Sequence, residues 1–220
     1  MAYDFIGLVN DVCGRLNEVP LTTTNFATTT GYYTFVKEAV NSSIRHIQQE
    51  EFEWSWNHIE QDLTLVAGTS RESFPADAKT INMQSFRIKR NDTIGNGTQH
   101  LKEITYEEYL EKYVDQEYDS GTANRGMPRL VARAPSREFI LIPEPDEAYE
   151  LVYEYYTLGF DLEVDTDVPQ IPEPYRHVIV NGAMYYAYQF RNDAQMANMS
   201  LQMFEDGIKY LRSLHINRYK

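Results

Sequence analysis

The chain has 220 residues, and its 33 acidic and 20 basic residues give it a formal net charge of -13 at pH 7. This charge excludes a protein that grips nucleic acid phosphates over a wide surface, but it is compatible with a protein past which DNA slides. The length suits one large domain, or a core with one sizeable insertion, that needs no metal or disulfide for stability.

The cysteine count and the hydropathy of the sequence exclude further classes of protein. The single cysteine, Cys13, excludes a disulfide framework within the chain and fits a reducing environment. The start of the sequence has no basic segment followed by a long apolar run, and no stretch approaches the roughly 18 consecutive apolar residues of a membrane helix. We therefore expect a protein that is neither secreted nor embedded in a membrane.

Residues 1–56 are predicted to form the N-terminal helices of a bundle. Asp4 is the expected N-cap of a helix that ends before Pro20. A threonine-rich loop is expected over 21–30, and a longer helix then reaches about Phe52. The apolar stripes of the two helices are Phe5, Leu8, Val9, Val12 and Leu16, and Tyr33, Val36, Val40, Ile44 and Ile47.

Residues 57–160 change to the period of strands and are predicted to form an inserted β-rich domain. Segments 62–66 and 74–75 indicate a hairpin, and 85–90 alternates apolar and basic residues as a strand does. Segment 91–98, which contains two glycines, is expected to be a turn or exposed loop.

The second half of this domain is predicted to contain one short helix and three strands. Thr105 and Glu108 have the spacing of a capping box, and the helix that they start carries Tyr106, Tyr109, Leu110 and Tyr113 on one side. The expected strands cover 130–133, 138–142 and 149–158, and antiparallel pairing is the simplest arrangement for them.

Residues 161–220 are predicted to complete the bundle with two helices. Pro172 and Pro174 place the start of the first helix near Glu173, and Asn192 is the expected N-cap of the second. The first helix carries the stripe Tyr175, Val178, Ile179, Gly182 and Tyr186. The second carries two adjacent stripes, Leu201, Phe204, Ile208 and Leu211 beside Met196, Met199, Met203, Tyr210 and Leu214.

The apolar arc of the last helix is wider than packing against one neighbour requires. Either its own domain buries the methionine side, or this side forms a subunit interface, for which the adaptable methionine side chain is well suited. Taken together, the elements predict an α+β protein in which N- and C-terminal helices form a bundle with an inserted antiparallel β-rich domain.

The sequence contains no motif that predicts catalysis, a cofactor or a bound metal. The five histidines have no HExxH spacing, the Gly95–Gly97 turn lacks the third glycine of a dinucleotide fingerprint, and neither a P-loop nor a nucleophile elbow is present. We therefore predict that the protein is not an enzyme and has no catalytic residues, cofactor or metal site.

Two acidic patterns leave alternatives open. The alternating carboxylates of 161–167 resemble the first ligands of a calcium loop, but the turn glycine and the late glutamate of that loop are missing, so a solvated acidic linker is the competing interpretation. The carboxylates of 103–111 provide a possible pair for glycoside hydrolysis, or else a solvated helix face.

Three segments resemble the head-to-tail adaptor, or connector, proteins of short-tailed bacteriophages, the group that includes the tail tubular protein A type. The segments are FIGLVNDVCGRLNEVPL, LTLVAGTSRESFPADAKTI and IPEPYRHVIVNGAMYYAYQFRNDAQMANMSLQMFEDGIKYLRS, which together span nearly the whole chain. None of them is a catalytic motif, so the resemblance depends on their order.

The resemblance implies a virion structural protein at the head-tail junction, assembled in the host cytoplasm. It implies a homo-oligomeric ring, typically of twelve copies, that binds the portal protein and the tail nozzle protein. DNA would pass through this ring without sequence-specific binding. In such adaptors a C-terminal segment commonly reaches the portal, and in this chain that segment is His215, Ile216, Asn217, Arg218, Tyr219 and Lys220.

A ring requires one heterologous interface repeated around a closed axis. The predicted interface residues are Met196, Met199, Met203, Tyr210 and Leu214. An alternative from another class is a carbohydrate-binding or glycan-cleaving phage protein in which the β-rich block presents Trp54, Trp56 and tyrosines to sugar rings. A tail-completion protein at another position of the virion would differ from the adaptor only in its neighbours.

Overall fold

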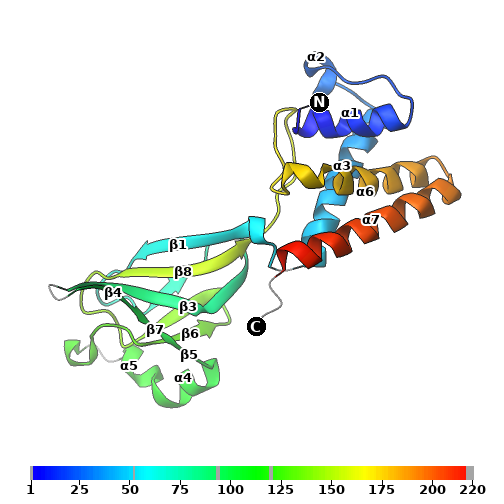
Figure 1. The fold of residues 1–220 in the computed structure, drawn as a ribbon. Helices are drawn as coiled ribbons and strands as arrows, with labels where there is room; N and C mark the ends of the chain where they lie inside the picture. Colours follow the sequence, from blue (N-terminus) through cyan, green and yellow to red (C-terminus); the bar gives the residue numbers. More distant parts are fainter. Residues whose placement is uncertain (1, 52, 93–94, 119–120, 217–220) are drawn as a thin grey trace. The chain divides into compact units, whose positions relative to one another are not determined.

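The computed structural model describes residues 2–51, 53–92, 95–118 and 121–216 (Figure 1). The chain divides into two compact units, one formed by Met1–Asn57 with Leu158–Lys220 and the other by His58–Thr157. We call these the helical unit and the β unit. The predicted α+β class is confirmed.

The helical unit is organised around α6 (Arg176–Phe190), which packs against α1 (Phe5–Arg15), α3 (Tyr32–Glu50) and α7 (Ala194–His215) (Figure 1). Residues around much of the α6 circumference are buried because three helices surround it, namely Val178, Ile179, Val180, Gly182, Ala183, Met184 and Ala187. Short helical turns complete the unit: α2 (Thr23–Phe26), η1 (Ser55–Asn57) and η3 (Glu173–Tyr175).

Several local predictions in the helical unit are confirmed and two are wrong. Asp4 caps α1 by accepting a hydrogen bond from the Gly7 amide at 2.8 Å. The segment 21–30 is not only a loop, because it contains α2. The N-cap of α7 is Asp193 rather than Asn192, because Asn192 takes the left-handed conformation, with φ of 57°, in the turn after α6.

The β unit contains two four-stranded sheets and short helices. The first sheet has the order β1-β8-β3-β4, with β1 (His58–Thr64), β8 (Glu150–Thr157), β3 (Ala78–Asp92) and β4 (Gly95–His100). The second has the order β2-β7-β6-β5, with β2 (Arg71–Ser73), β7 (Glu138–Ile142), β6 (Leu130–Ala134) and β5 (Lys102–Ile104). The helical segments are α4 (Tyr106–Lys112), α5 (Val114–Tyr118) and η2 (Thr122–Asn124).

The two sheets enclose one apolar core, and the second sheet has a smaller core on its other face. The first core joins Ile88 and Tyr153 of the first sheet to Phe139 of the second. The smaller core packs Tyr109 of α4 against Ile140 of β7. The second sheet is therefore covered on both faces, whereas the first sheet leaves its outer face in solvent.

The predicted strand pairings of this unit need three corrections. Segments 62–66 and 74–75 do not form a hairpin with each other, because β1 pairs with β8 and β2 pairs with β7. The described part of 91–98 belongs to the paired strands β3 and β4 rather than to a loop. Of the three later strands only β6 and β7 pair with each other, and the edge strand β5 joins β6 in parallel.

The capping box predicted at α4 is half formed. The Thr105 hydroxyl accepts a hydrogen bond from the Glu108 amide at 3.2 Å, as predicted. The Glu108 carboxylate instead accepts from Lys112 Nζ at 2.8 Å, one helical turn further on. This ion pair lowers the pKa of Glu108, chiefly through the Lys112 hydrogen bond.

Candidate functional site

The inner face of α7 fixes this helix firmly to the helical unit. Phe204, Ile208 and Leu211 are buried, and the Phe204 ring packs edge-on against His46 with 5.1 Å between ring centroids. Gly182 and Gly207 let α6 and α7 approach closely, because a Cβ at Gly207 would lie 2.9 Å from a Val178 methyl group. The rotation of α7 about its own axis is therefore determined by packing.

This rotation turns the predicted interface residues into solvent. Their exposed fractions are 37% for Met196, 48% for Met199, 56% for Met203, 54% for Tyr210 and 52% for Leu214. At 100° per residue the five positions fall within about 60° of one another around the helix. They form one straight apolar stripe, which we call the α7 flank.

The α7 flank has the spacing of a helix-pairing seam. Met196, Met203 and Tyr210 are seven residues apart, and Met199 lies three residues after the first of them. Met196, Met203 and Tyr210 share the a position of a heptad and Met199 occupies the first d position, whereas the next two d positions are Asp206 and Ser213. The first heptad of the flank therefore has the apolar pattern by which helices pack side by side. A row of exposed apolar side chains on an otherwise well-packed helix is typical of a protein-protein contact.

The end of α7 is held by a cluster of aromatic and polar groups that the sequence analysis did not predict. The two ring nitrogens of His215 lie 2.8 Å from Ser55 Oγ and 2.8 Å from the Tyr175 hydroxyl. The Trp56 ring packs edge-on against His215 and stacks on Trp54 with 4.5 Å between centroids. The cluster unites residues 160 positions apart in the sequence, so no local signal could have revealed it.

Of the predicted portal-contact segment, the structure describes only the first two residues. His215 belongs to this cluster, and Ile216 packs partly buried against the core of the helical unit. Residues 217–220, which are Asn217, Arg218, Tyr219 and Lys220, lie outside the described residues.

The tryptophans named in the carbohydrate alternative do not present a sugar platform. Trp54 is completely buried, and its indole nitrogen donates to the Ile47 carbonyl at 2.8 Å. Both tryptophans lie in the helical unit rather than in the β unit to which that alternative assigned them. Their stacked arrangement closes the end of α3, which is a packing role.

Two carboxylates of the acidic segment 161–167 make hydrogen bonds or ion pairs within the helical unit. Asp167 accepts hydrogen bonds from the amides of Glu163 and Val164 at 2.7 and 2.8 Å, and Asp161 pairs with Arg45 at 2.8 Å. These contacts use one oxygen of Asp167 and one of Asp161, two of the four carboxylates that the calcium alternative required. Within the described ranges, no three His, Cys, Asp or Glu side chains are grouped to hold a metal ion.

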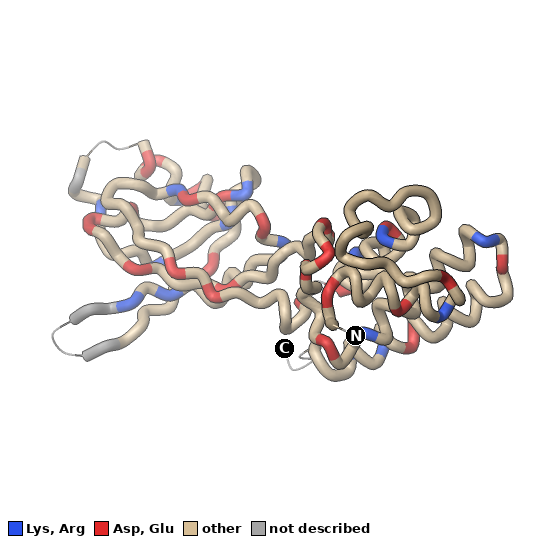
Figure 2. The backbone as a smooth tube through the Cα atoms, turned by 90° about the horizontal axis from the view of Figure 1, so that it is seen from above, with Lys and Arg blue, Asp and Glu red and all other residues tan. Residues whose placement is uncertain are grey.

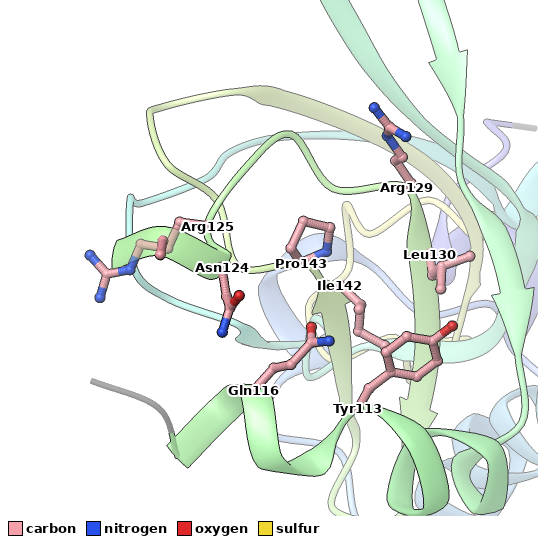
Figure 3. Close-up of a pocket in the computed structure, with 9 residues that line it drawn as sticks. Tyr113, Gln116, Asn124, Arg125, Arg129, Leu130, Ile142 and Pro143 are labelled. Carbon is pink, nitrogen blue, oxygen red and sulfur yellow. The ribbon is translucent and has the colours of Figure 1, made fainter. Parts of the chain in front are cut away.

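A hollow of about 510 Å³ lies in the β unit between the α4–α5 segment and the ends of β6 and β7. Gln116 and Asn124 face each other across it, and Arg125 and Arg129 point away from it (Figure 3). Its remaining lining residues are Tyr113, Ala123, Leu130, Ile142 and Pro143. Among the described residues that line the hollow there is no carboxylate, thiol or imidazole, the usual groups for acid-base or nucleophilic chemistry.

None of the helices in the described part of the chain combines the length and the apolar content needed to cross a membrane.

No curated protein is significantly similar to the chain. A family model described as SU10 adaptor protein matches residues 3–219 and thus extends through both units. Since this match covers nearly the whole sequence, the chain belongs to the SU10 adaptor family and is a bacteriophage structural adaptor protein.

Proposed function

We propose that this adaptor forms a homo-oligomeric ring at the head-tail junction of the virion, as tail tubular protein A type adaptors do. The ring joins the portal protein to the tail nozzle protein and continues the channel through which DNA leaves the head. It carries out no catalysis, and it assembles in the host cytoplasm from about twelve copies, each using the same two surfaces.

The observation that carries this proposal is the exposed α7 flank. A ring needs a surface on each subunit that fits a different surface of the next, and heptad-spaced apolar residues provide such a surface. Methionine side chains adapt to irregular partners because they are unbranched and flexible. Burial of the five flank side chains between neighbours would remove from water the largest continuous apolar stripe on α7.

The portal contact is proposed for the C-terminal segment from His215 to Lys220. Its first residue is anchored through Ser55 and Tyr175, so the rest of the segment starts from a fixed point. Arg218 and Lys220 give it a positive charge in an otherwise acidic chain. Such a segment is suited to an acidic groove on a partner.

The net charge of -13 fits a channel through which DNA slides. Carboxylates near the channel repel the phosphates and prevent tight binding at any one position. We therefore propose that DNA passes through the ring without sequence-specific contacts.

Assembly in the presence of the portal and nozzle proteins of the same phage tests the proposal. We expect electron microscopy and light scattering to show closed rings of this chain bound to both partners. A chain that stays monomeric with both partners present would contradict the proposed ring.

A double variant, Met199→Gln with Met203→Gln, tests the role of the α7 flank. Glutamine matches methionine in length and helix propensity, so the fold should be retained while the apolar surface is lost. We expect ring formation to be lost or weakened at least tenfold, measured by sedimentation. The control is Val19→Thr, which also replaces an exposed apolar side chain by a polar one. Val19 is 72% exposed and lies outside the flank.

A further inference from the structure

The outer face of the first sheet is electrically polarised across its strands. The residues that point outward alternate with buried residues such as Ile88 and Leu151. Along β1 and β8 they include four carboxylates, those of Glu60, Asp62, Glu150 and Glu154. Along β3 and β4 they include Arg87, Lys89 and His100. Basic positions lie close together on one arm of the β3–β4 hairpin (Figure 2).

The acidic side and the basic side end at the two edges of the sheet. β1 is one edge strand and β4 is the other. Neither contains the proline or lysine with which edge strands commonly prevent further pairing, and the glycines of β4 allow another backbone to approach. Because all three neighbouring pairs are antiparallel, β4 of one copy placed beside β1 of the next would also run antiparallel to it.

A contact within the chain shows how far a cation on β3 reaches. Lys89 Nζ lies 2.7 Å from Asp62 Oδ1, so the lysine extends across β8 to a carboxylate two strands away. Arg87 is on the same face and is exposed. Within the described part of the chain, the Arg87 guanidinium takes part in no hydrogen bond or ion pair, and the Glu60 carboxylate acts on Lys89 without forming an ion pair with it.

We propose that β4 of one copy pairs with β1 of the next copy in the ring, and that Arg87 reaches across β4 to Glu60 of that neighbour. This inference rests on the ring proposed above. In this arrangement a second copy of the chain binds at each open edge of the sheet. The acidic edge of one copy faces the basic edge of another, and this charge complementarity favours the pairing. The contact is head-to-tail, as closure into a ring demands.

Cross-linking between copies tests the pairing. Thr64 and Thr98 are exposed and lie on one row of the sheet, which runs Thr64, Glu150, Lys89, Thr98. Within one copy they are three strand spacings, about 14 Å, apart. With Glu60 of the next copy opposite His100, Thr64 of that copy lies diagonally beside Thr98, about 8 Å away. A bis-maleimide shorter than that span can join cysteines at these positions only between copies. Cys13 does not interfere, because it is buried and burial raises its pKa to about 11.

We expect the double variant Thr64→Cys with Thr98→Cys, assembled with portal and nozzle, to give a ladder of covalent oligomers on a denaturing gel. Either single variant should give at most dimers. Rings that are visible by electron microscopy but give no ladder would overturn this pairing while leaving the ring intact. Cross-links to the portal or nozzle protein instead would also overturn it. If no rings form, the proposed function fails, and the pairing with it.

Charge exchange tests the Arg87–Glu60 contact. We expect Glu60→Arg or Arg87→Glu alone to weaken ring association roughly tenfold. The double variant should recover most of this loss, because the charges are then exchanged on both sides of every interface. Glu111→Arg on α4, which makes the same change in net charge at an exposed position, should not weaken association. Equal effects of Glu60→Arg and Glu111→Arg, or no recovery in the double variant, would overturn the contact.

Discussion

Gly182 shows how one residue fixes the geometry of the helical unit. A Cβ at this position would lie 2.2 Å from Ser43 Oγ on α3 and 2.7 Å from Cε2 of the Phe204 ring on α7. Both neighbours are buried, and the Ser43 hydroxyl donates a hydrogen bond to the Ile179 carbonyl at 2.8 Å. We therefore expect Gly182→Ala to lower the free energy of unfolding by about 1–3 kcal/mol, measured by urea denaturation.

Gly14 provides the matched control on α1. A Cβ there would meet nothing within 4 Å, and the residue lies in the last turn of the helix. Gly14→Ala should raise the free energy of unfolding by about 0.5–1 kcal/mol, because alanine loses less backbone entropy on folding. Equal effects of the two substitutions would contradict the close approach at Gly182.

Glu117 makes the stability of the β unit depend on pH. Arg71 donates from Nε at 2.5 Å and from Nη2 at 3.0 Å to the two carboxylate oxygens, and Tyr109 donates to one of them. The Arg71 hydrogen bonds lower the pKa of Glu117, whereas burial and then the Glu117 hydrogen bond raise the pKa of Tyr109 to about 12. The stabilisation is present above the unfolded-state pKa, near 4.3, and is lost as pH falls through the lower folded-state pKa.

We expect Glu117→Gln to lower the free energy of unfolding by about 1.5 kcal/mol at pH 7, because the ionised acceptor is lost. The difference between the native chain and the variant should shrink as the pH falls below about 4.3. Urea denaturation at several pH values measures it, with the exposed Glu111→Gln as control. A difference that stays constant down to about pH 2 would contradict the role of the ionised carboxylate.

The hydrogen bonds of a side chain could be predicted where the partner group is close in the sequence. Asp4 and Thr105 were predicted as N-caps because the amides that they bind are three residues away. The shift of the α7 cap to Asp193 depends on the backbone conformation of its neighbour, which composition does not specify. The contacts of His215 with Ser55 and Tyr175 arise only from tertiary packing.

At the level of elements, helices were easier to predict than strand pairing. The periods of α1, α3 and α7 report their buried faces directly, since one helix turn repeats every 3.6 residues. Strand positions such as β7 were also evident, but their partners were not. β1 pairs with β8, almost 90 residues later, and a two-residue periodicity contains no information about such a partner.

Two adjacent residues of α7 separate its packing face from the proposed interface. Phe204 is completely buried, whereas Met203 is 56% exposed. We expect Phe204→Ala to lower the free energy of unfolding by about 3–5 kcal/mol and Met203→Ala to change it by less than about 0.5 kcal/mol. Urea denaturation of the monomer measures both. A large effect of Met203→Ala would mean that the α7 flank stabilises the subunit itself.

At the level of the whole molecule, the order of segments carried more functional information than any single residue. The family match spans 3–219, while the carbohydrate and calcium alternatives each depended on a few side chains, of which Trp54 is buried in packing and Asp167 binds nearby backbone amides. An excess of apolar area on α7 could be recognised from the sequence as a candidate interface, but no partner surface could be proposed for it, because no periodicity relates two different patches.

Net charge predicts how salt affects assembly of the whole particle. Copies that each carry -13 repel one another, and we expect this repulsion to outweigh the attraction between the acidic and basic sheet edges at low salt. The screening length falls from about 30 Å at 0.01 M salt to about 8 Å at 0.15 M. We therefore expect the rate of ring assembly to rise about tenfold over this range, followed by light scattering. The Met199→Gln, Met203→Gln variant should assemble at least tenfold less than the native chain at both concentrations. A rate that falls with salt would instead show that attraction between opposite charges, rather than the apolar flank, drives the encounter.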